Sequence, residues 1–319
     1  MVSPRIIFMG TPEFAVASLE ALLKQQFQIV AVVTAPDKPA GRGMKMTQSA
    51  VKKYALENGL KILQPVKLKD PAFLDELRAL NADLQIVVAF RMLPDMVWNM
   101  PPMGTINVHG SLLPQYRGAA PINWAIINGE NETGVTTFKL KHEIDTGDIL
   151  MQESFPIGED ETAGQVHDRM MHIGADLLVR TIKGLVEGSL QPMSQDMLVN
   201  SQYHQGTGPK HAPKINSETC RINWSQPVEK VHDLVRGLSP FPGAFTILNE
   251  KMLKVYKTRK ELTIPQHTEG DLVTDRKTYL KFACSNGYIH LIDVQMEGKK
   301  KMEITEFLRG YRFNNSPSE

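Results

Sequence analysis

The chain has 319 residues and a net charge of +1, with 42% hydrophobic and 22% charged residues, which is ordinary for a globular protein of about two domains. Its two cysteines, Cys220 and Cys284, form no Cys-x-x-Cys pair and no zinc-type spacing, which excludes a cysteine-based zinc site and fits a reducing compartment. The apolar run Ile6–Met9 is too short for a signal peptide, and no stretch approaches the ~18 apolar residues of a membrane span, so we expect a cytoplasmic protein without a membrane partner.

Strand and helix patterns alternate along residues 1–190, which we take as the first domain. The expected strands are Arg5–Met9, Gln28–Thr34, Leu84–Phe90, Thr105–His109, Val135–Lys141 and Ile149–Phe155. The expected helices are Glu13–Lys24, Phe73–Leu80, Pro94–Asn99, Ala120–Asn128 and Thr162–Glu187. The alternation predicts an α/β fold with a mostly parallel sheet and helices on both faces. Ligands of such sheets bind at the carboxyl ends of the strands.

The pattern changes after residue 190. Residues 188–214 contain three prolines and three glycines with little apolar periodicity, and we place a linker at 191–210 and a second domain at 211–319. One helix, Pro227–Leu238, precedes a series of short expected strands: Ala244–Leu248, Leu253–Thr258, Asp271–Thr274, Tyr279–Ala283 and Tyr288–Val294. Short strands at this spacing predict a small β-barrel.

The charge is distributed unevenly along the chain. Residues 1–205 contain 18 basic and 22 acidic side chains, a net charge of −4, whereas residues 206–319 contain 18 and 13, a net charge of +5. A basic excess in the last third suggests a polyanionic partner, although an ordinary fluctuation would give the same count.

The densest run of polar chemistry lies between residues 107 and 148. Asn107 and His109 are two residues apart at the end of an expected strand, so their side chains share a face where a ligand site is expected. A later loop contains Asp145 beside Gly147, a glycine that allows a close backbone approach.

These residue types suit the transfer of an acyl group to an amine. Asn107 and His109 can stabilise the oxyanion that develops at the attacked carbonyl, and Asp145 can orient the imidazole or accept a proton. No Gly-x-Ser-x-Gly is present and neither cysteine is near, and this chemistry requires no nucleophilic side chain. The alternative is structural, with a core histidine, a strand-capping asparagine and an aspartate in a turn.

The run Asn107-Val108-His109-Gly110-Ser111-Leu112-Leu113-Pro114, followed by Arg117-Gly118 and Asp145-Thr146-Gly147-Asp148, resembles the signature of the folate-dependent formyltransferases. The resemblance implies a Rossmann-like formyltransferase domain in which Asn107, His109 and Asp145 are catalytic. It also implies 10-formyltetrahydrofolate as co-substrate and no metal. The residues that it implies for folate binding are Phe90, Arg91, Met92, Leu93, Ser111, Leu112, Leu113, Pro114 and Asp145. The sequence departs from the family at Arg91, where a glycine is usual.

Three further features resemble the members of this family that act on methionyl-tRNA. They are the start Gly10–Ala15, the basic loop Pro36–Gly43, and the C-terminal third, which resembles that branch's oligonucleotide-binding (OB) type domain. They imply initiator methionyl-tRNA as a partner. The implied tRNA contacts are Lys38, Arg42, Lys45, Lys210 and Lys214, with Lys299–Lys301 as weaker candidates.

The resemblance implies formyl transfer from 10-formyltetrahydrofolate to the amino group of methionyl-tRNA, with Asp145 holding the imidazole of His109 in its charged form. We expect a monomer. Phe241 and Phe245 are expected to pack in the core or a turn rather than to stack on bases. The rivals are a sugar-nucleotide or glycinamide ribonucleotide formyltransferase, a 10-formyltetrahydrofolate hydrolase, and a catalytically silent tRNA-binding protein. The basic loop favours the tRNA enzyme over the small-molecule enzymes.

Overall fold

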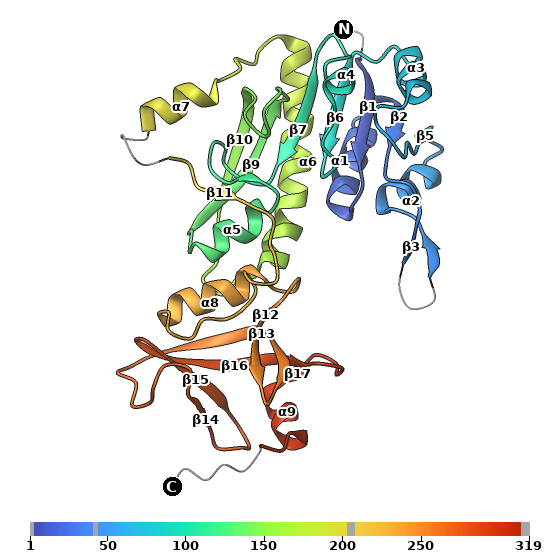
Figure 1. Cartoon of the computed structure of the whole chain (residues 1–319). Helices are drawn as coiled ribbons and strands as arrows, with labels where there is room; N and C mark the ends of the chain where they lie inside the picture. Colours follow the sequence, from blue (N-terminus) through green and yellow to red (C-terminus); the bar gives the residue numbers. More distant parts are fainter. Residues whose placement is uncertain (1–2, 41–43, 203–207, 314–319) are drawn as a thin grey trace. The chain divides into compact units, whose positions relative to one another are not determined.

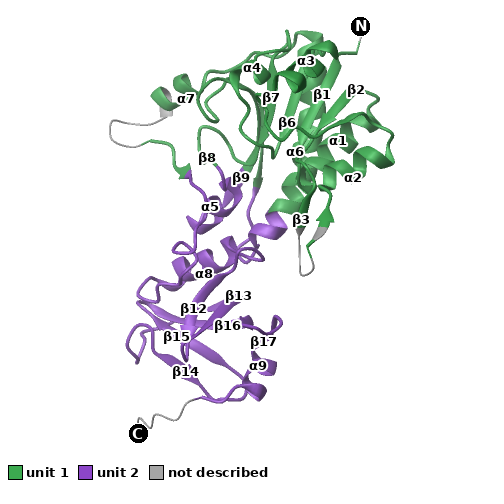
Figure 2. Cartoon of the chain, turned by 45° about the vertical axis from the view of Figure 1, so that its right-hand side comes forward, with its two compact units in different colours: residues 1–118, 134–155, 167–211 green, residues 119–133, 156–166, 212–319 purple. Residues whose placement is uncertain are grey.

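A computed structural model describes residues 3–40, 44–202 and 208–313 of the chain. They form two compact units, coloured separately in Figure 2. Unit 1 comprises residues 1–118, 134–155 and 167–211, and unit 2 comprises residues 119–133, 156–166 and 212–319. Because the chain passes from one unit to the other more than once, position in the sequence alone does not assign an element to a unit.

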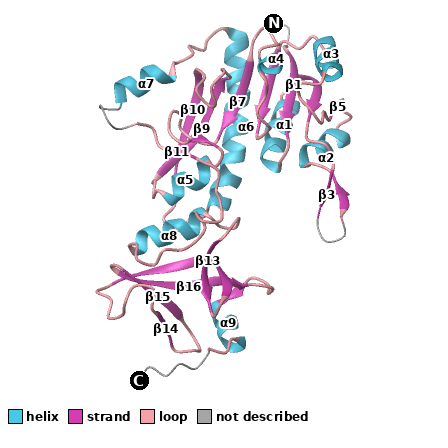
Figure 3. Cartoon of the chain, in the orientation of Figure 1, coloured by secondary structure: helices cyan, strands magenta, loops and turns pink. Residues whose placement is uncertain are grey.

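The larger sheet has seven strands in the order β10-β9-β7-β6-β1-β2-β5. Its strands are magenta in Figure 3, and β2 and β6 are labelled in Figure 1. The strands are β1 (Arg5–Gly10), β2 (Gln28–Val33), β5 (Ile62–Leu63), β6 (Leu84–Val88), β7 (Thr105–His109), β9 (Glu132–Lys139) and β10 (Ile149–Pro156). Four neighbouring pairs, β1–β2, β1–β6, β6–β7 and β2–β5, are parallel, and β9 runs antiparallel to β7. The predicted α/β fold with a mostly parallel sheet is confirmed.

Helices pack against both faces of this sheet (Figure 1). They are α1 (Glu13–Lys24), α2 (Ala50–Glu57), α3 (Pro71–Ala79), α4 (Asp95–Trp98) and α6 (Ala163–Glu187). Phe73 of α3 and Val97 of α4 share a buried cluster with Val87 of β6. On α6, a Cβ added to Gly174 would lie 3.3 Å from methyl groups of Val108 and Val135, so this helix covers the other face.

Four short elements between β2 and α3, namely β3, β4, α2 and β5, were not predicted. The hairpin β3 (Lys38–Ala40) and β4 (Lys45–Thr47) follows β2, and helix α2 comes next. Ser49 caps α2 by accepting a hydrogen bond from the Lys52 amide at 3.0 Å. Near the start of the hairpin, the Asp37 carboxylate accepts hydrogen bonds from Lys52 at 2.6 Å and Gln64 at 2.9 Å. Strands of two or three residues carry too little periodicity for a sequence pattern to reveal them.

Unit 2 is built around a curled antiparallel sheet in the order β12-β13-β16-β15-β14, with β17 beside β16 (Figure 1). Its strands are β12 (Ala244–Leu248), β13 (Lys251–Leu262), β14 (Leu272–Thr274), β15 (Leu280–Cys284), β16 (Gly287–Met296) and β17 (Met302–Glu303). Its helices are α5 (Pro121–Ile127), α8 (Val228–Gly237) and α9 (Ile304–Gly310). The sheet agrees with the predicted OB-like domain. Strand β13 continues beyond the predicted Thr258 because register shifts on either side of Lys257 break its alternation.

Residues 188–214, which sequence patterns gave only as a linker, hold helix α7 (Gln195–Gln202) and strand β11 (His211–Ala212). Strand β11 forms a two-stranded sheet with β8 (Arg117–Gly118). Helix α7 is held to unit 1 by Leu198, which packs against a buried cluster of Leu113, Phe138 and Ile149. Helix α7 and strand β11 are therefore packed elements rather than parts of an extended linker.

Candidate active site

Asn107 and His109 lie on the same face of β7, near its carboxyl end. Asn107 pairs with Val87 of β6, whose side chain belongs to the cluster under α3 and α4, so both residues point away from α6. His109 is buried, with 6% of its surface exposed, whereas Asn107 is half-buried. Among the residues that the structure describes, none forms a hydrogen bond with the Asn107 side chain. Its amide is therefore available to a ligand.

The His109 ring is held from two sides. Its Nε2 lies 2.9 Å from the carbonyl oxygen of Tyr116. A carbonyl only accepts, so Nε2 carries a hydrogen and donates, which leaves Nδ1 as the ring nitrogen available to another partner. Nδ1 lies 3.8 Å from Oδ2 of Asp145. The ring also meets the edge of Phe138, with centroids 6.4 Å apart. The structure thus brings His109 and Asp145 together and leaves one imidazole nitrogen facing the carboxylate.

Asp145 is held in a strained loop. Its backbone has φ 55°, in the left-handed region, and its side chain is 11% exposed. Oδ2, the oxygen nearest His109, accepts a hydrogen bond from the Gly118 amide at 3.0 Å. Two residues on, a Cβ added to Gly147 would lie 1.5 Å from the carbonyl oxygen of Lys139. The loop therefore follows β9 so closely that only glycine fits at position 147.

The run 111–114 is shaped by polar groups beneath it. Thr136 Oγ1 donates to the Ser111 carbonyl at 2.6 Å and accepts from the Leu113 amide at 3.1 Å. Gln152 Nε2 donates to the Leu113 carbonyl at 2.8 Å, and the Leu113–Pro114 peptide is cis. Ser111 and Leu113 are buried, whereas Leu112 is half-buried. The Ser111 carbonyl and the Leu113 amide and carbonyl are therefore bonded within the protein, and these bonds fix the shape of the run.

Residues 90–93 follow β6 and point in different directions. Arg91 turns toward the β5–α3 loop and donates to the carbonyls of Pro65 at 2.8 Å and Val66 at 3.1 Å. Burial lowers the pKa of its guanidinium. Leu93 is buried in the α3–α4 cluster, whereas the Met92 side chain is 74% exposed. Arg91, which stands where the family usually has a glycine, is therefore hydrogen-bonded to the β5–α3 loop.

The basic residues predicted to contact RNA lie in three places. Lys38 is exposed on β3, Lys210 precedes β11, and Lys214 is exposed in the segment before α8. Arg42 lies outside the described residues, and so does the side chain of Lys45. Lys210 has a structural role through its backbone, because its carbonyl accepts from the Tyr116 amide at 2.6 Å.

Three residues that position the site were missed by sequence reasoning: Thr136, Tyr116 and Gln195. Tyr116 acts through a carbonyl, which no side-chain pattern reveals. Thr136 lies within a buried strand, and Gln195 lies in a segment that was interpreted as a linker. Gln195 is 1% exposed and donates to the carbonyls of Asp145 at 2.9 Å and Gly147 at 2.7 Å. A single glutamine in a polar stretch gives no sequence signal for such a role.

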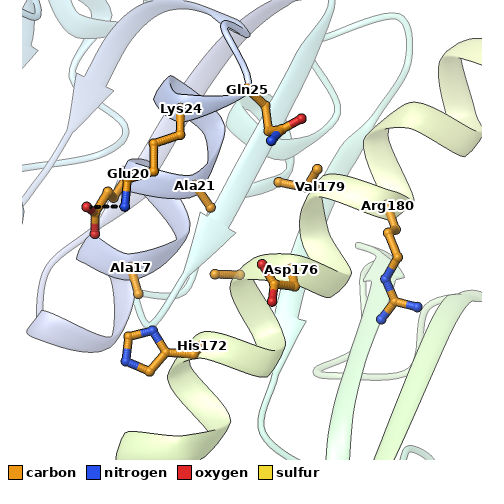
Figure 4. A pocket seen from close by; sticks show the side chains of 10 residues that line it. Ala17, Glu20, Ala21, Lys24, Gln25, His172, Asp176, Val179 and Arg180 are labelled. Carbon is orange, nitrogen blue, oxygen red and sulfur yellow. Dashed lines mark ion pairs between the residues drawn. The ribbon is translucent and has the colours of Figure 1, made fainter.

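The described residues also include two cysteines and a surface hollow that lie apart from the predicted site. Cys220 and Cys284 are buried in unit 2, and burial raises the pKa of the Cys284 thiol to about 12. No group of three His, Cys, Asp or Glu side chains is arranged there for a metal ion. No helix in the described ranges is long and apolar enough to cross a membrane. A hollow of about 350 Å³ between α1 and α6 is lined in part by Lys24 and His172 and holds none of the predicted site residues (Figure 4).

Two family descriptions match the chain. Residues 4–182 match the family described as formyl transferase, and residues 214–312 match the formyl transferase C-terminal domain. The first match alone covers more than half of the chain and contains Asn107, His109 and Asp145.

Curated relatives extend the match to nearly full length. A methionyl-tRNA formyltransferase of Bacteroides fragilis is 48% identical over 318 residues, covering 98% of this chain and 96% of the relative. The methionyl-tRNA formyltransferase of Parabacteroides distasonis is 51% identical over 314 residues, covering 97% of this chain and 96% of the relative. A solved N-formyltransferase from Helicobacter canadensis, in complex with folinic acid and dTDP-3-aminofucose, shares the fold with a TM-score of 0.68 at 21% identity, covering 94% of this chain and 100% of that one. The chain therefore belongs to the formyl transferase family, and within it to the group of the methionyl-tRNA formyltransferases.

Proposed function

We propose that this protein transfers the formyl group of 10-formyltetrahydrofolate to the amino group of initiator methionyl-tRNA, giving N-formylmethionyl-tRNA for translation initiation. The observation that carries the proposal is the pairing of His109 Nδ1 with the Asp145 carboxylate at 3.8 Å, on the same strand face as the available amide of Asn107. Identities of 48–51% to curated methionyl-tRNA formyltransferases over nearly the whole chain support the acceptor.

The formyl donor would bind at the carboxyl ends of β6 and β7. We propose that Met92, which follows β6, and the run 111–114, which follows β7, contact the folate. Phe90, Arg91 and Leu93 would support this pocket from beneath rather than reach into it, since Arg91 is bonded to the neighbouring loop and Leu93 is buried. The formyl carbon would then face Asn107 and His109.

The reaction needs an oxyanion stabiliser and a proton carrier. The unprotonated amine attacks the formyl carbon, and the Asn107 amide and protonated Nδ1 of His109 stabilise the oxygen as it gains negative charge. Asp145 stabilises the proton on Nδ1 and helps to remove the proton that the amine loses. When the bond from the formyl carbon to the folate nitrogen breaks, that nitrogen takes up a proton. No side-chain nucleophile is involved.

The tRNA would be held by basic groups on both units. We propose Lys38, Arg42 and Lys45 as contacts to the acceptor end, and Lys210 and Lys214 as contacts to backbone phosphates. The residues up to 190 would form the catalytic domain, 191–210 the linker and 211–319 the tRNA-binding domain. We further propose that the protein acts as a cytoplasmic monomer.

The decisive experiment incubates the purified protein with methionyl-tRNA and 10-formyltetrahydrofolate and measures N-formylmethionine after deacylation. We expect product with the wild type, and Asp145→Asn should lower kcat by about 10²–10⁴-fold, because the charge facing His109 is lost. The matched control is Glu143→Gln, an exposed carboxylate in the same loop, which should turn over like the wild type.

Each rival gives a different result in this assay. Folate consumed without an acceptor would identify a hydrolase. Formylation of a sugar nucleotide or of glycinamide ribonucleotide in place of methionyl-tRNA would move the substrate elsewhere in the family. Retention of tRNA without any folate turnover would identify a silent binding protein.

A further inference from the structure

The side chain of Gln195 connects three parts of the candidate active site. Its Nε2 donates to the carbonyls of Asp145 at 2.9 Å and of Gly147 at 2.7 Å. Its Oε1 accepts from Nε of Arg117 at 3.0 Å and from Nη2 of the same guanidinium at 2.7 Å. A glutamine amide has two N–H donors and two acceptor positions, and all four are used here. At 1% exposure, no water can replace these partners without opening the structure.

These bonds form a closed network around the Asp145 carboxylate, which runs through Gln195, Arg117, Gly118 and Asp145. Arg117 belongs to β8, and the next residue, Gly118, donates its amide hydrogen to Asp145 Oδ2 at 3.0 Å. Gln195 thus holds the backbone of Asp145 and also holds the strand that orients its side chain. The oriented oxygen is the one that lies 3.8 Å from His109 Nδ1. A change at Gln195 would therefore alter the distance between these two atoms.

The loop that Gln195 holds needs such support. Asp145 adopts φ 55°, a conformation that costs a non-glycine residue free energy and persists only where surrounding contacts enforce it. Helix α7, which supplies Gln195, is itself anchored, because Leu198 packs on Leu113 and Phe138 and Met193 pairs with Ile149 in a β-bridge. The contacts that hold the Asp145 loop therefore come from helix α7, which is itself held by packing.

We propose that Gln195 is a positioning residue for catalysis, which sets the placement of Asp145 Oδ2 relative to His109. The proposal rests on the proposed function for its kinetic consequence. The amide is required because a carboxylate at position 195 keeps the acceptor for Arg117 but has no hydrogen to donate to the two carbonyls. An asparagine is one methylene too short to reach both sides.

The test compares Gln195→Glu and Gln195→Asn with Met197→Ala, a control on the same helix whose side chain is 71% exposed. Both Gln195 variants should lower kcat by about 10–100-fold, because small displacements of catalytic groups are costly, while KM for methionyl-tRNA stays within about twofold. The pH–rate profile should shift in both and stay unchanged in Met197→Ala. A folded Gln195→Glu protein with the wild-type kcat and pH profile would overturn the proposal.

A second measurement does not depend on the substrate. Backbone amide exchange over residues 140–148 should accelerate in Gln195→Glu. It should also accelerate in Arg117→Met, which removes the two hydrogen bonds that Arg117 donates to Gln195. Unchanged exchange in both variants would overturn the proposal even if activity fell. If the wild type fails to formylate methionyl-tRNA, the proposed function fails, and faster exchange over 140–148 would still support positioning by Gln195.

Discussion

At the scale of single residues, the site depends on backbone groups as much as on side chains. The Tyr116 carbonyl selects the hydrogen-bearing nitrogen of His109, and the Gly118 amide orients Asp145. The guanidinium of Arg91 likewise bonds to backbone groups, the carbonyls of Pro65 and Val66. Residue identity and local geometry therefore have to be considered together.

Gly147 is the position where an added methyl group should cost most. In Gly147→Ala the Cβ would lie 1.5 Å from the Lys139 carbonyl oxygen, which is backbone and cannot move aside without displacing β9. We expect a loss of about 1–3 kcal/mol in the free energy of unfolding, and at least a tenfold loss of kcat because Asp145 is displaced. Urea denaturation and formylation kinetics measure the two effects. Gly310→Ala, whose Cβ would meet nothing within 4 Å, should be close to the wild type on both.

Arg91 should contribute to stability rather than to chemistry. Replacing it with alanine removes two hydrogen bonds from a charged donor, and we expect a loss of about 1–2 kcal/mol in the free energy of unfolding. The dissociation constant for the folate should change by less than about threefold. Thermal or urea unfolding and a folate-binding titration measure these quantities. Loss of folate binding at unchanged stability would contradict this account.

At the scale of elements, the sequence predicted those with strong periodicity. Helix α1 and strand β7 agree with the predicted bounds, because both have regular apolar spacing and clear ends. The hairpin β3–β4, helix α7 and helix α9 were missed, since short elements take their stability from tertiary contacts rather than from pattern. Phe241, which was expected in the core or a turn, lies in the turn before β12, and its side chain is 81% exposed. Phe245, by contrast, packs against the unit 2 core.

Helix α8 should make unit 2 sensitive to acid. The pKa of His232 is lowered from its ordinary value of 6.5, first by burial and then by Lys260, with Arg236 acting in the same direction and Asp160 and Asp233 opposing. Below pH 6.5 the unfolded chain binds a proton at His232 that the folded chain resists. The contribution of neutral His232 to the free energy of unfolding is therefore fully present above pH 6.5 and is lost as the pH falls.

We therefore expect the Tm to be lower at pH 5.5 than at pH 7.5, with a smaller difference in His232→Gln. Differential scanning calorimetry measures both. Burial also lowers the pKa of His290, so His290 should account for part of the Tm difference that remains in His232→Gln. His142→Gln, which changes an exposed side chain, should leave the difference unchanged. Equal pH sensitivity in the wild type and His232→Gln would count against this assignment.

At the scale of the whole molecule, the charge asymmetry predicts how RNA binding responds to salt. Residues 206–319 carry a net charge of +5, and each lysine that neutralises a phosphate adds about one to the slope of log K against log salt. Lys214→Ala should therefore weaken binding and reduce the slope by about one. Filter binding at several salt concentrations measures it. Lys24→Ala, which removes an ammonium paired with Glu20 at 2.7 Å, should leave the slope unchanged.

The sequence by itself determined the fold class, the catalytic candidates and the family, because strand periodicity and the order Asn-x-His before Asp-x-Gly-Asp are local properties of the chain. Only the tertiary structure decided that Oδ2 of Asp145 faces Nδ1 of His109 and that Arg91 is directed toward residues 65 and 66. It also decided that Gln195 bonds to Asp145, 50 positions away in the sequence. These features depend on hydrogen bonds between distant backbone and side-chain groups. Such bonds leave no periodic trace along the chain, so they appear only when the chain is folded.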